Sequence, residues 1–305
     1  MTSADSIRDS PRFGREPVVT GDRYGSESET GPTAVDLNVD AALVLQNMAG
    51  IDSYPDVLAL FPNIPDIAER DRVHAVVTDQ LTEAGVVEDG RVHPAVEAWL
   101  QILHRPDMEL AVRVMDNGLG GHEPTMLRLS LVRHGEHHVL AVRCDDHVVI
   151  QPVFHHGRQL NTHAAVVKSA LGDYPLLQFE PISAPVEELA AAPDDPVERR
   201  RVLCELGATP HAAGVLTRAM TEVVRRAEVV MVEHRDGGSG SIHTRAGVNI
   251  LDTMTGRLIV NPRAAMDGQL WSTFQPGDDA AIKAGIDALV ELLPGRSWFD
   301  TSRTP

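Results

Sequence analysis

Histidines crowd one part of the chain, where they could bind a metal ion. Six of the 14 lie within residues 134–156, namely His134, His137, His138, His147, His155 and His156. Cys144 to Asp146 adds further ligand types, and a zinc site needs several such side chains to converge. Successive side chains of a strand point to opposite faces, so His137 diverges from His138, and His155 from His156. We therefore expect solvated turn histidines and no metal site; a metal-dependent enzyme using this stretch is the alternative.

Three short motifs begin like catalytic or cofactor signatures but do not complete them. His122-Glu123 opens like a zinc protease helix, yet the second histidine is absent and Pro124 would break the helix. In Gly118–Gly121 the third glycine of a dinucleotide loop would fall at Glu123, whose carboxylate would repel a pyrophosphate. Gly237–Ser241 lacks the last glycine of a nucleophile elbow. We predict no catalytic residue, no metal ligand and no bound cofactor, and therefore a protein that is not an enzyme.

The charge and cysteine content limit the partners and the compartment. The 305 residues carry 44 acidic and 27 basic side chains, which gives a formal net charge of -17. This balance argues against nucleic acid and anionic lipid as partners, because both require clustered cations. Cys144 and Cys204 are too few for a disulfide framework, which fits a reducing compartment. No apolar run reaches the length of a membrane helix, so we expect a cytoplasmic protein without membrane insertion.

The first 33 residues differ in composition from the rest. They are rich in Ser, Gly, Thr, Pro and mixed charge, and their few apolar residues follow no helical or strand period. Such a segment buries too little apolar surface to offset its chain entropy. We predict a disordered N-terminal tail over residues 1–33 and a folded domain over residues 34–305.

The first half of that domain, residues 34–180, opens on an alternating strand at 35–39, and Asp40 is expected to cap a helix from Ala41 to Met48. Two further helices are predicted: one from Asp66, which has the capping-box spacing to Glu69, and one from Pro94. Four strands and a closing helix should follow, at residues 110–114, 127–133, 139–143, 148–154 and 160–171.

The second half, residues 181–305, repeats the order of helix, helix, four strands and helix. Asp195 and Glu198 again have the capping-box spacing, and Thr209-Pro210 opens the next helix. The strands and the closing helix are expected at residues 227–233, 247–252, 257–260, 269–274 and 278–293. The alternative is that such orders recur by chance in α+β chains.

If the duplication is real, the two four-strand meanders should join edge to edge about a pseudo-twofold axis, because this buries the most exposed strand edges. The predicted fold is α+β, with a central antiparallel β-sheet built from two pseudo-twofold-related halves and flanked by two α-helical bundles.

Short motifs in a fixed order run through most of the chain. The second half contains Ile250-Leu251-Asp252-Thr253, Gly256-Arg257-Leu258-Ile259-Val260, Asp267-Gly268, Trp271-Ser272-Thr273-Phe274 and Leu292-Leu293-Pro294. The first half adds Leu81-Thr82-Glu83-Ala84-Gly85-Val86 and Arg105-Pro106-Asp107. In order and spacing these motifs resemble the EspG chaperones of type VII (ESX) secretion systems. The resemblance covers Val35 to Asp300.

The resemblance implies a cytosolic chaperone that binds PE/PPE heterodimers at the hydrophobic tip of the PPE subunit. It would keep them soluble and assist their delivery to a matching secretion system. EspG proteins have a central antiparallel sheet between two helical bundles with a quasi-twofold relation, which agrees with the duplication. A 1:1:1 complex is expected, with weak self-association of the unloaded chaperone.

The resemblance also indicates where the partner would bind. Contacts in the family come chiefly from the sheet, the loop between the second and third strands, and the C-terminal helical bundle. That loop maps onto Asp116 to Pro124, whose one large apolar residue is Leu119. The expected partner-binding residues are Asp116, Asn117, Gly118, Leu119, Gly120, Gly121 and His122 of the loop, with Trp271 and Phe274 of the second half.

Overall fold

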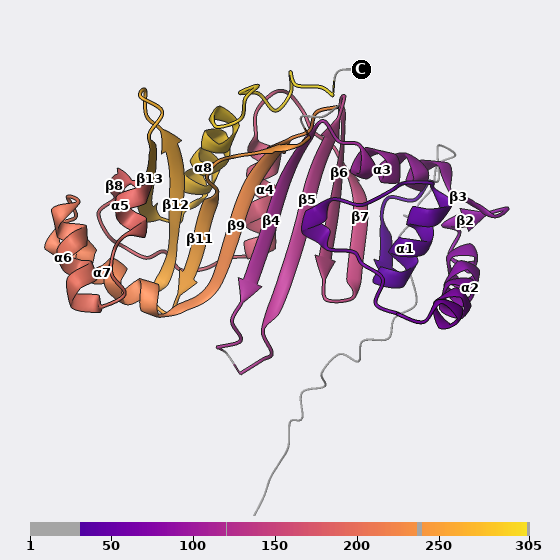
Figure 1. The fold of residues 1–305 in the computed structure, drawn as a ribbon, viewed down its shortest axis with the longest axis horizontal. Helices are drawn as coiled ribbons and strands as arrows, with labels where there is room; N and C mark the ends of the chain where they lie inside the picture. The colour runs from indigo at the N-terminus through magenta and orange to yellow at the C-terminus, as the bar shows by residue number, and fades with distance from the viewer. Residues whose placement is uncertain (1–30, 120, 237–239, 304–305) are drawn as a thin grey trace, which may run out of the picture.

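One large antiparallel sheet forms the centre of the molecule (Figure 1). The computed structural model describes residues 31–119, 121–236 and 240–303, so the predicted tail falls almost wholly outside the described residues. The sheet strands are β1 (Val35–Asn38), β4 (Met108–Asp116), β5 (Thr125–His134), β6 (His137–Cys144), β7 (His147–Val153), β8 (Ile182–Pro185), β9 (Val223–Glu233), β10 (Ile242–His243), β11 (Val248–Thr253), β12 (Gly256–Ala264) and β13 (Leu270–Pro276). A separate small hairpin joins β2 (Val87–Glu88) to β3 (Arg91–Val92).

The strand order is the same in both halves of the sheet. It reads β1-β7-β6-β5-β4-β9-β11-β12-β13-β8, with β10 paired to β9. Outward from the centre, each half therefore runs through the four strands of its meander. It ends on the strand that comes first in that half of the sequence, β1 in the first half and β8 in the second. The meanders join where β4 pairs with β9, from Met108 opposite Glu233 to Asp116 opposite Arg225. The rotational relation between the halves stays a prediction.

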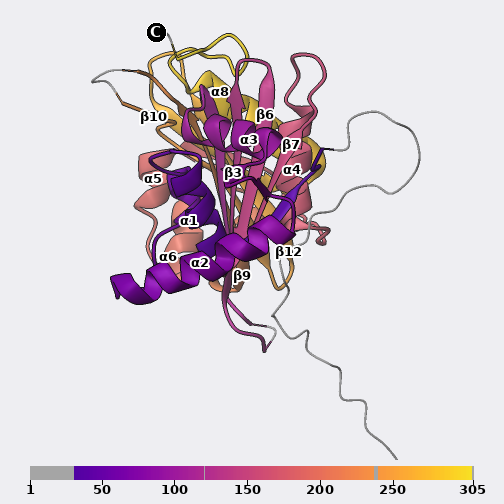
Figure 2. The same cartoon turned by 90° about the vertical axis from the view of Figure 1, so that its right-hand side faces the viewer.

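The helices lie at the two sides of the sheet and on one of its faces (Figures 1 and 2). One bundle contains α1 (Val39–Met48), α2 (Ile67–Glu83) and α3 (Pro94–His104), with a short 3-10 turn, η1, at Asp56–Leu58. The other contains α5 (Val186–Ala190), α6 (Pro196–Glu205) and α7 (Pro210–Thr221). The two closing helices, α4 (Asn161–Leu171) and α8 (Asp279–Glu291), pack against each other. The α+β fold with its large antiparallel sheet is thus confirmed.

Three apolar clusters hold these layers together. The first packs α1 and α3 on β6 and β7, with Leu45 and Leu100 fully buried. The second lies under α4 and α8 and includes Leu110, Ile286 and Trp298. The third packs α7 against β11 and β12. Burial of apolar surface contributes roughly 25 cal/mol per Å², so each bundle is held to the sheet by its own apolar face.

Short polar side chains cap several of the helices at their first turns, and one of the predicted caps is wrong. Asp66 accepts from the Glu69 N–H over 2.8 Å, and Asp195 from the Glu198 N–H over 2.9 Å. The cap predicted at Asp40 is wrong: Asn38 accepts from the Ala41 N–H over 2.8 Å. Val39 therefore begins α1 rather than ending β1. None of the described helices is long and apolar enough to cross a membrane.

Candidate partner-binding site

The loop between β4 and β5 leaves the sheet at one end, which we call the loop end, and its base is firmly held. The Asn117 N–H donates to the Val224 carbonyl over 2.9 Å, and the Asn117 side-chain amide donates to the Val223 carbonyl over 3.0 Å. Asp116 accepts from the Gly118 N–H over 2.9 Å. These bonds fix the first half's loop to the first residues of β9, in the second half.

Leu119 projects from this fixed base into solvent. Its side chain is 61% exposed, although leucine normally contributes to folding by being buried. The chain turns sharply around it, because Gly118 has a φ of +70° and accepts from the Gly121 N–H over 3.1 Å. His122 lies exposed beyond the turn, and Gly120 lies outside the described residues. The one large apolar residue of the loop is therefore exposed.

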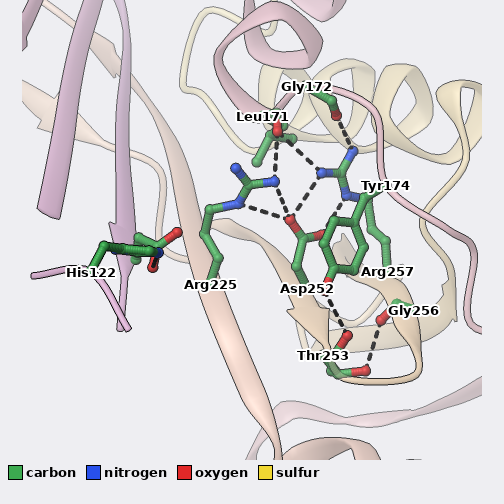
Figure 3. A network of polar contacts seen from close by, with 10 residues as sticks. His122, Leu171, Gly172, Tyr174, Arg225, Asp252, Thr253, Gly256 and Arg257 are labelled. Atoms are coloured by element: carbon green, nitrogen blue, oxygen red, sulfur yellow. Dashed lines mark hydrogen bonds and ion pairs between the residues drawn. The ribbon is translucent and has the colours of Figure 1, made fainter. Parts of the chain in front are cut away.

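Four charged residues stand in register across the sheet at the loop end. Asp116 pairs with Arg225, Arg225 with Asp252, and Asp252 with Arg257. Arg225 donates from Nε to Asp252 Oδ2 over 2.8 Å, and Arg257 from Nε to Asp252 Oδ1 over 2.6 Å. Figure 3 shows the two guanidinium groups on either side of the Asp252 carboxylate. The row ties β9, β11 and β12 together beside the loop.

The positive charge left over in this network is balanced by the end of α4. Arg257 also donates to the Gly172 carbonyl over 3.0 Å, and Arg225 to the Leu171 carbonyl over 2.6 Å (Figure 3). Carbonyls at a helix C-terminus carry partial negative charge, so two cations are tolerated around one carboxylate. The Tyr174 ring lies 5.7 Å from the Arg257 guanidinium. The motif residues Asp252 and Arg257 thus join the closing helix of the first half to a hairpin of the second.

Two more exposed apolar side chains lie at the same end of the sheet. Met254, in the β11–β12 turn, is 68% exposed, and Met220, near the end of α7, is 37% exposed. The Met254 N–H donates to the Glu222 carbonyl over 3.1 Å. Since Asn117 bonds to Val223 and Val224, the loop and the turn border the same short segment from two sides. We call Leu119, Met220 and Met254 the apolar rim.

The two aromatic residues predicted with the loop lie elsewhere. Phe274 is only 8% exposed and packs in the third core cluster, opposite Val260 and Ile182. Trp271 is half-buried on β13, which is four strands away from β4. Gly277 marks the loop end beside β13, because its N–H donates to the Arg257 carbonyl, and Trp271 lies six residues away from Gly277 toward the opposite end of the sheet. At about 4.8 Å per strand and about 3.4 Å per residue, this is roughly 19 Å across and 20 Å along. The structure therefore does not bring Trp271 and Phe274 to the loop, and Phe274 is buried. Partner binding by these two residues stays a prediction.

The expectation of solvated turn histidines is wrong for part of the set. His137 is exposed as expected, but His138 is buried, and His155 is half-buried beside it with ring centroids 5.1 Å apart. His163, which its helix position did not single out, completes a cluster of three. Burial lowers the pKa of His138 to about 4 and that of His163 to about 3, with the neighbouring imidazoles adding to both shifts. In the described ranges, no three His, Cys, Asp or Glu side chains are placed to hold a metal ion.

Glu109, His234 and Ser241 form a hydrogen-bonded chain that the sequence did not suggest. Glu109 bonds to His234 Nε2 over 3.2 Å, and His234 Nδ1 to Ser241 Oγ over 2.8 Å. The three line a cavity of about 370 Å³ between β4, β9 and the segment around Tyr54. Glu109 lies on β4, His234 directly follows β9 and Ser241 directly precedes β10, so only the folded sheet brings the three together. Their bonds hold the segment after β9 against β4.

Comparison with known proteins identifies the family. A model of the EspG family matches residues 38–288. The chain belongs to the EspG family. Two residues of the motifs that carry the resemblance, Asp252 and Arg257, have a structural role in the charged row.

Named EspG relatives match nearly the full chain. The ESX-1 secretion-associated protein EspG1 of Mycobacterium marinum is 33% identical over 285 residues, which is 93% of this chain and 96% of the relative. The ESX-3 secretion-associated protein EspG3 of Mycolicibacterium smegmatis is 33% identical over 274 residues, 88% of this chain and 90% of the relative. Because the sequence identity to the ESX-1 relative and to the ESX-3 relative is the same, identity alone does not assign this EspG protein to either secretion system.

A solved structure has the same fold. It is the Mycobacterium tuberculosis type VII secretion system chaperone EspG5 in complex with a PE25-PPE41 dimer. The match has a TM-score of 0.74 and covers 88% of this chain and 100% of that chain, at 19% sequence identity. The arrangement of sheet and helices is therefore shared with a chaperone that has been seen with its client.

Proposed function

We propose that this EspG protein is a specific chaperone of PE/PPE heterodimers for a type VII (ESX) secretion system. The observation that carries the proposal is family membership over nearly the whole chain, joined to the fold of a relative solved with a PE/PPE dimer. The chaperone binds mainly the PPE subunit, at its hydrophobic tip, in a 1:1:1 complex. It keeps the pair soluble until delivery.

The client surface that we propose is the loop end of the sheet. It contains the loop residues Asp116–His122 and the apolar rim, with Leu119 as the anchor. An interface that buries about 1,200 to 2,000 Å² draws most of its energy from a few such side chains. Exposed leucine and methionine side chains suit an apolar client tip, and methionine adapts its shape to irregular surfaces. Trp271, half-buried on β13, provides a separate contact farther along the sheet.

We further propose that the protein acts in the cytoplasm, without catalysis, as one folded domain over residues 34–305 with halves 34–180 and 181–305. The charge of -17 supports this role, because it keeps an unloaded chaperone dispersed while an apolar rim is exposed. Residual self-association through the rim is expected to be weak. A purely structural scaffold would have no client.

Co-expression with candidate PE/PPE pairs, followed by size-exclusion chromatography, tests the function. We expect one pair to elute with the full chain as a ternary complex and to precipitate when it is expressed alone. A screen of the pairs encoded by the source genome in which none changes its elution volume or solubility would contradict the proposal. Activity that depends on bound metal would instead favour the metal-dependent enzyme.

A further inference from the structure

Three histidine rings from different elements meet at the end of the sheet opposite the loop. His138 lies on β6, His155 follows β7, and His163 lies on α4. The ring centroids are 5.1 Å apart for His138 and His155, 5.7 Å for His155 and His163, and 6.1 Å for His138 and His163. His163 is 0% exposed and His138 6%. Two of the three rings are therefore shielded from water, and His155 is half-buried beside them.

The last described residues of the chain cover this cluster. We call residues 295–303 the C-terminal strap; they cross the end of the sheet above α8 (Figure 1). Trp298 donates from Nε1 to His138 Nε2 over 3.1 Å, and its ring meets that of His163 edge-on at 4.4 Å. Phe299 stacks on His155 at 5.0 Å. The two aromatic side chains thus attach the strap directly to the three imidazoles.

Four ring nitrogens in the cluster are buried without a hydrogen-bond partner. They are His138 Nδ1, His155 Nε2 and both nitrogens of His163. Buried polar atoms are normally paired, and those that are not point to a strained or switchable site. His138 Nε2 accepts from Trp298, so the neutral ring carries its hydrogen on Nδ1, and a further proton would go to Nε2 and displace the Trp298 N–H. A proton added to His163 would create a buried charge with no hydrogen-bond partner, which is strongly unfavourable.

The charged groups around the cluster do not offer a partner for such a proton. Arg133 on β5 and His137 on β6 disfavour a positive charge on His138, and a hydrogen bond with the Glu136 backbone, in the β5–β6 turn, favours one; the Glu136 side chain is exposed. The nearest carboxylates are already engaged: Asp107 accepts from Arg133 and from the Arg303 N–H, and on the strap Asp300 pairs with Arg158 from the α4 side. In the part of the chain that the structure describes, no carboxylate bonds to His138, His155 or His163.

We propose that this cluster makes the C-terminal strap a pH-sensitive latch, which is closed while the imidazoles are neutral and is released when they are protonated. The pKa values of about 4 for His138 and about 3 for His163 support this direction. Once the strap lifts, water reaches the rings and each pKa returns toward the ordinary value of about 6.5. The released form therefore binds more protons, and acid favours it.

The size of the effect follows from this linkage. A histidine with a pKa of about 6.5 is protonated about ten to one at pH 5.5 and about one to ten at pH 7.5. Each of the two buried histidines therefore raises the ratio of released to closed strap about tenfold over this interval. The latch lies at the far end of the sheet from the loop, so it is independent of the proposed client surface.

Hydrogen exchange of the full chain at pH 7.5 and 5.5, with rates divided by the intrinsic rate at each pH, tests the latch. We expect the Arg303 amide, which bonds to Asp107, and its neighbours in the strap to lose 10- to 100-fold in protection at pH 5.5. The amides of α8 should keep theirs. His163→Phe retains a buried ring without a titrating nitrogen, so it should reduce the loss about tenfold. His156→Phe, at an exposed site next to His155, should leave the loss unchanged.

Equal protection of the wild-type strap at both pH values would overturn the latch. This measurement uses the wild-type protein alone, so it does not depend on whether a variant folds. An undiminished acid effect in a folded His163→Phe variant would overturn it as well. Zinc is the third probe: if one ion per chain increases strap protection and EDTA reverses the increase, the cluster is a metal site and the latch proposal is wrong.

Discussion

The side-chain amide of Asn117 donates to the carbonyl of Val223 over 3.0 Å, and this bond ties the loop that carries Leu119 to the start of β9. The two residues belong to different halves of the chain. Because the base of the loop is already ordered, a client that contacts Leu119 has little loop entropy to remove on binding. The loop is therefore suited to act as a rigid anchor.

Gly118→Ala should distort this anchor. A Cβ at Gly118 would lie 2.4 Å from the His122 carbonyl oxygen, and the φ of +70° disfavours any side chain. We expect the free energy of unfolding to fall by about 1 to 2 kcal/mol and client affinity to fall about tenfold or more, measured by urea denaturation and calorimetry. Gly121→Ala is the control: its φ is +86° but no atom lies within 4 Å of the added Cβ. Equal losses in both variants would show that the contact with His122 is unimportant.

Asp252→Asn tests the charged row. The carboxylate is 1% exposed and accepts from two guanidinium groups, so its removal leaves the buried Arg257 and the half-buried Arg225 without a counter-charge. We expect the free energy of unfolding to fall by about 3 to 5 kcal/mol. Asp287→Asn, in an exposed i,i+4 pair with Lys283, should change it by less than about 0.5 kcal/mol. Similar small effects for both variants would contradict the role of the row.

Much of the fold follows from short-range patterns, as these residues illustrate. Asp66, Asp195 and Thr209 cap helices at the predicted positions, because capping depends only on the next three residues. The strand β8 escaped prediction because Ile182–Pro185 is short and ends in proline, which is tolerated there at the edge of a sheet. Its hydrogen-bonded pairing with β13 holds the segment in a strand conformation that its own sequence does not indicate.

The candidate site depends on contacts that local patterns do not contain. The exposure of Leu119 was predictable, since a leucine among glycines and polar residues has no core to enter. Met220 and Met254 reach the same end of the sheet only through the pairing of β9 with β4 and β11. In the sequence, His163 is simply one position of an amphipathic helix. It contacts His138 only because α4 packs on the sheet.

Acid should destabilise the protein through the buried histidines. Their pKa values of about 4 and about 3 in the folded chain lie below the ordinary value of about 6.5, so the unfolded chain binds more protons between these limits. The stability that they contribute is therefore full above about pH 6.5 and is lost as the pH falls toward 4. From pH 7 to 5 we expect a loss of about 2 kcal/mol per histidine in urea denaturation.

His163→Phe should remove about half of this pH dependence, and His156→Phe, at an exposed site, should leave it unchanged. A wild-type free energy of unfolding that stays constant between pH 7 and 5, after the other titrating groups are accounted for with these variants, would show that the cluster is not neutral in the folded chain.

Removal of metal should have no effect on the fold or on client binding. In the described ranges, no group of His, Cys, Asp or Glu is placed as a set of metal ligands. We expect dialysis against EDTA to leave the circular dichroism spectrum and the melting temperature unchanged. Stoichiometric zinc in the purified protein, with loss of structure on chelation, would instead support the metal-dependent alternative.

The affinity of Leu119→Asp for the PE/PPE pair that co-purifies with the wild type tests the central claim most directly. A charge placed against an apolar client tip should weaken binding at least 100-fold in calorimetry, while the melting temperature stays unchanged because the side chain is 61% exposed. Met266→Asp is the matched control, since Met266 is a fully exposed apolar residue in the turn at the other end of the sheet. We predict that it binds like the wild type. A folded Leu119→Asp variant with wild-type affinity would contradict the placement of the client at the loop end.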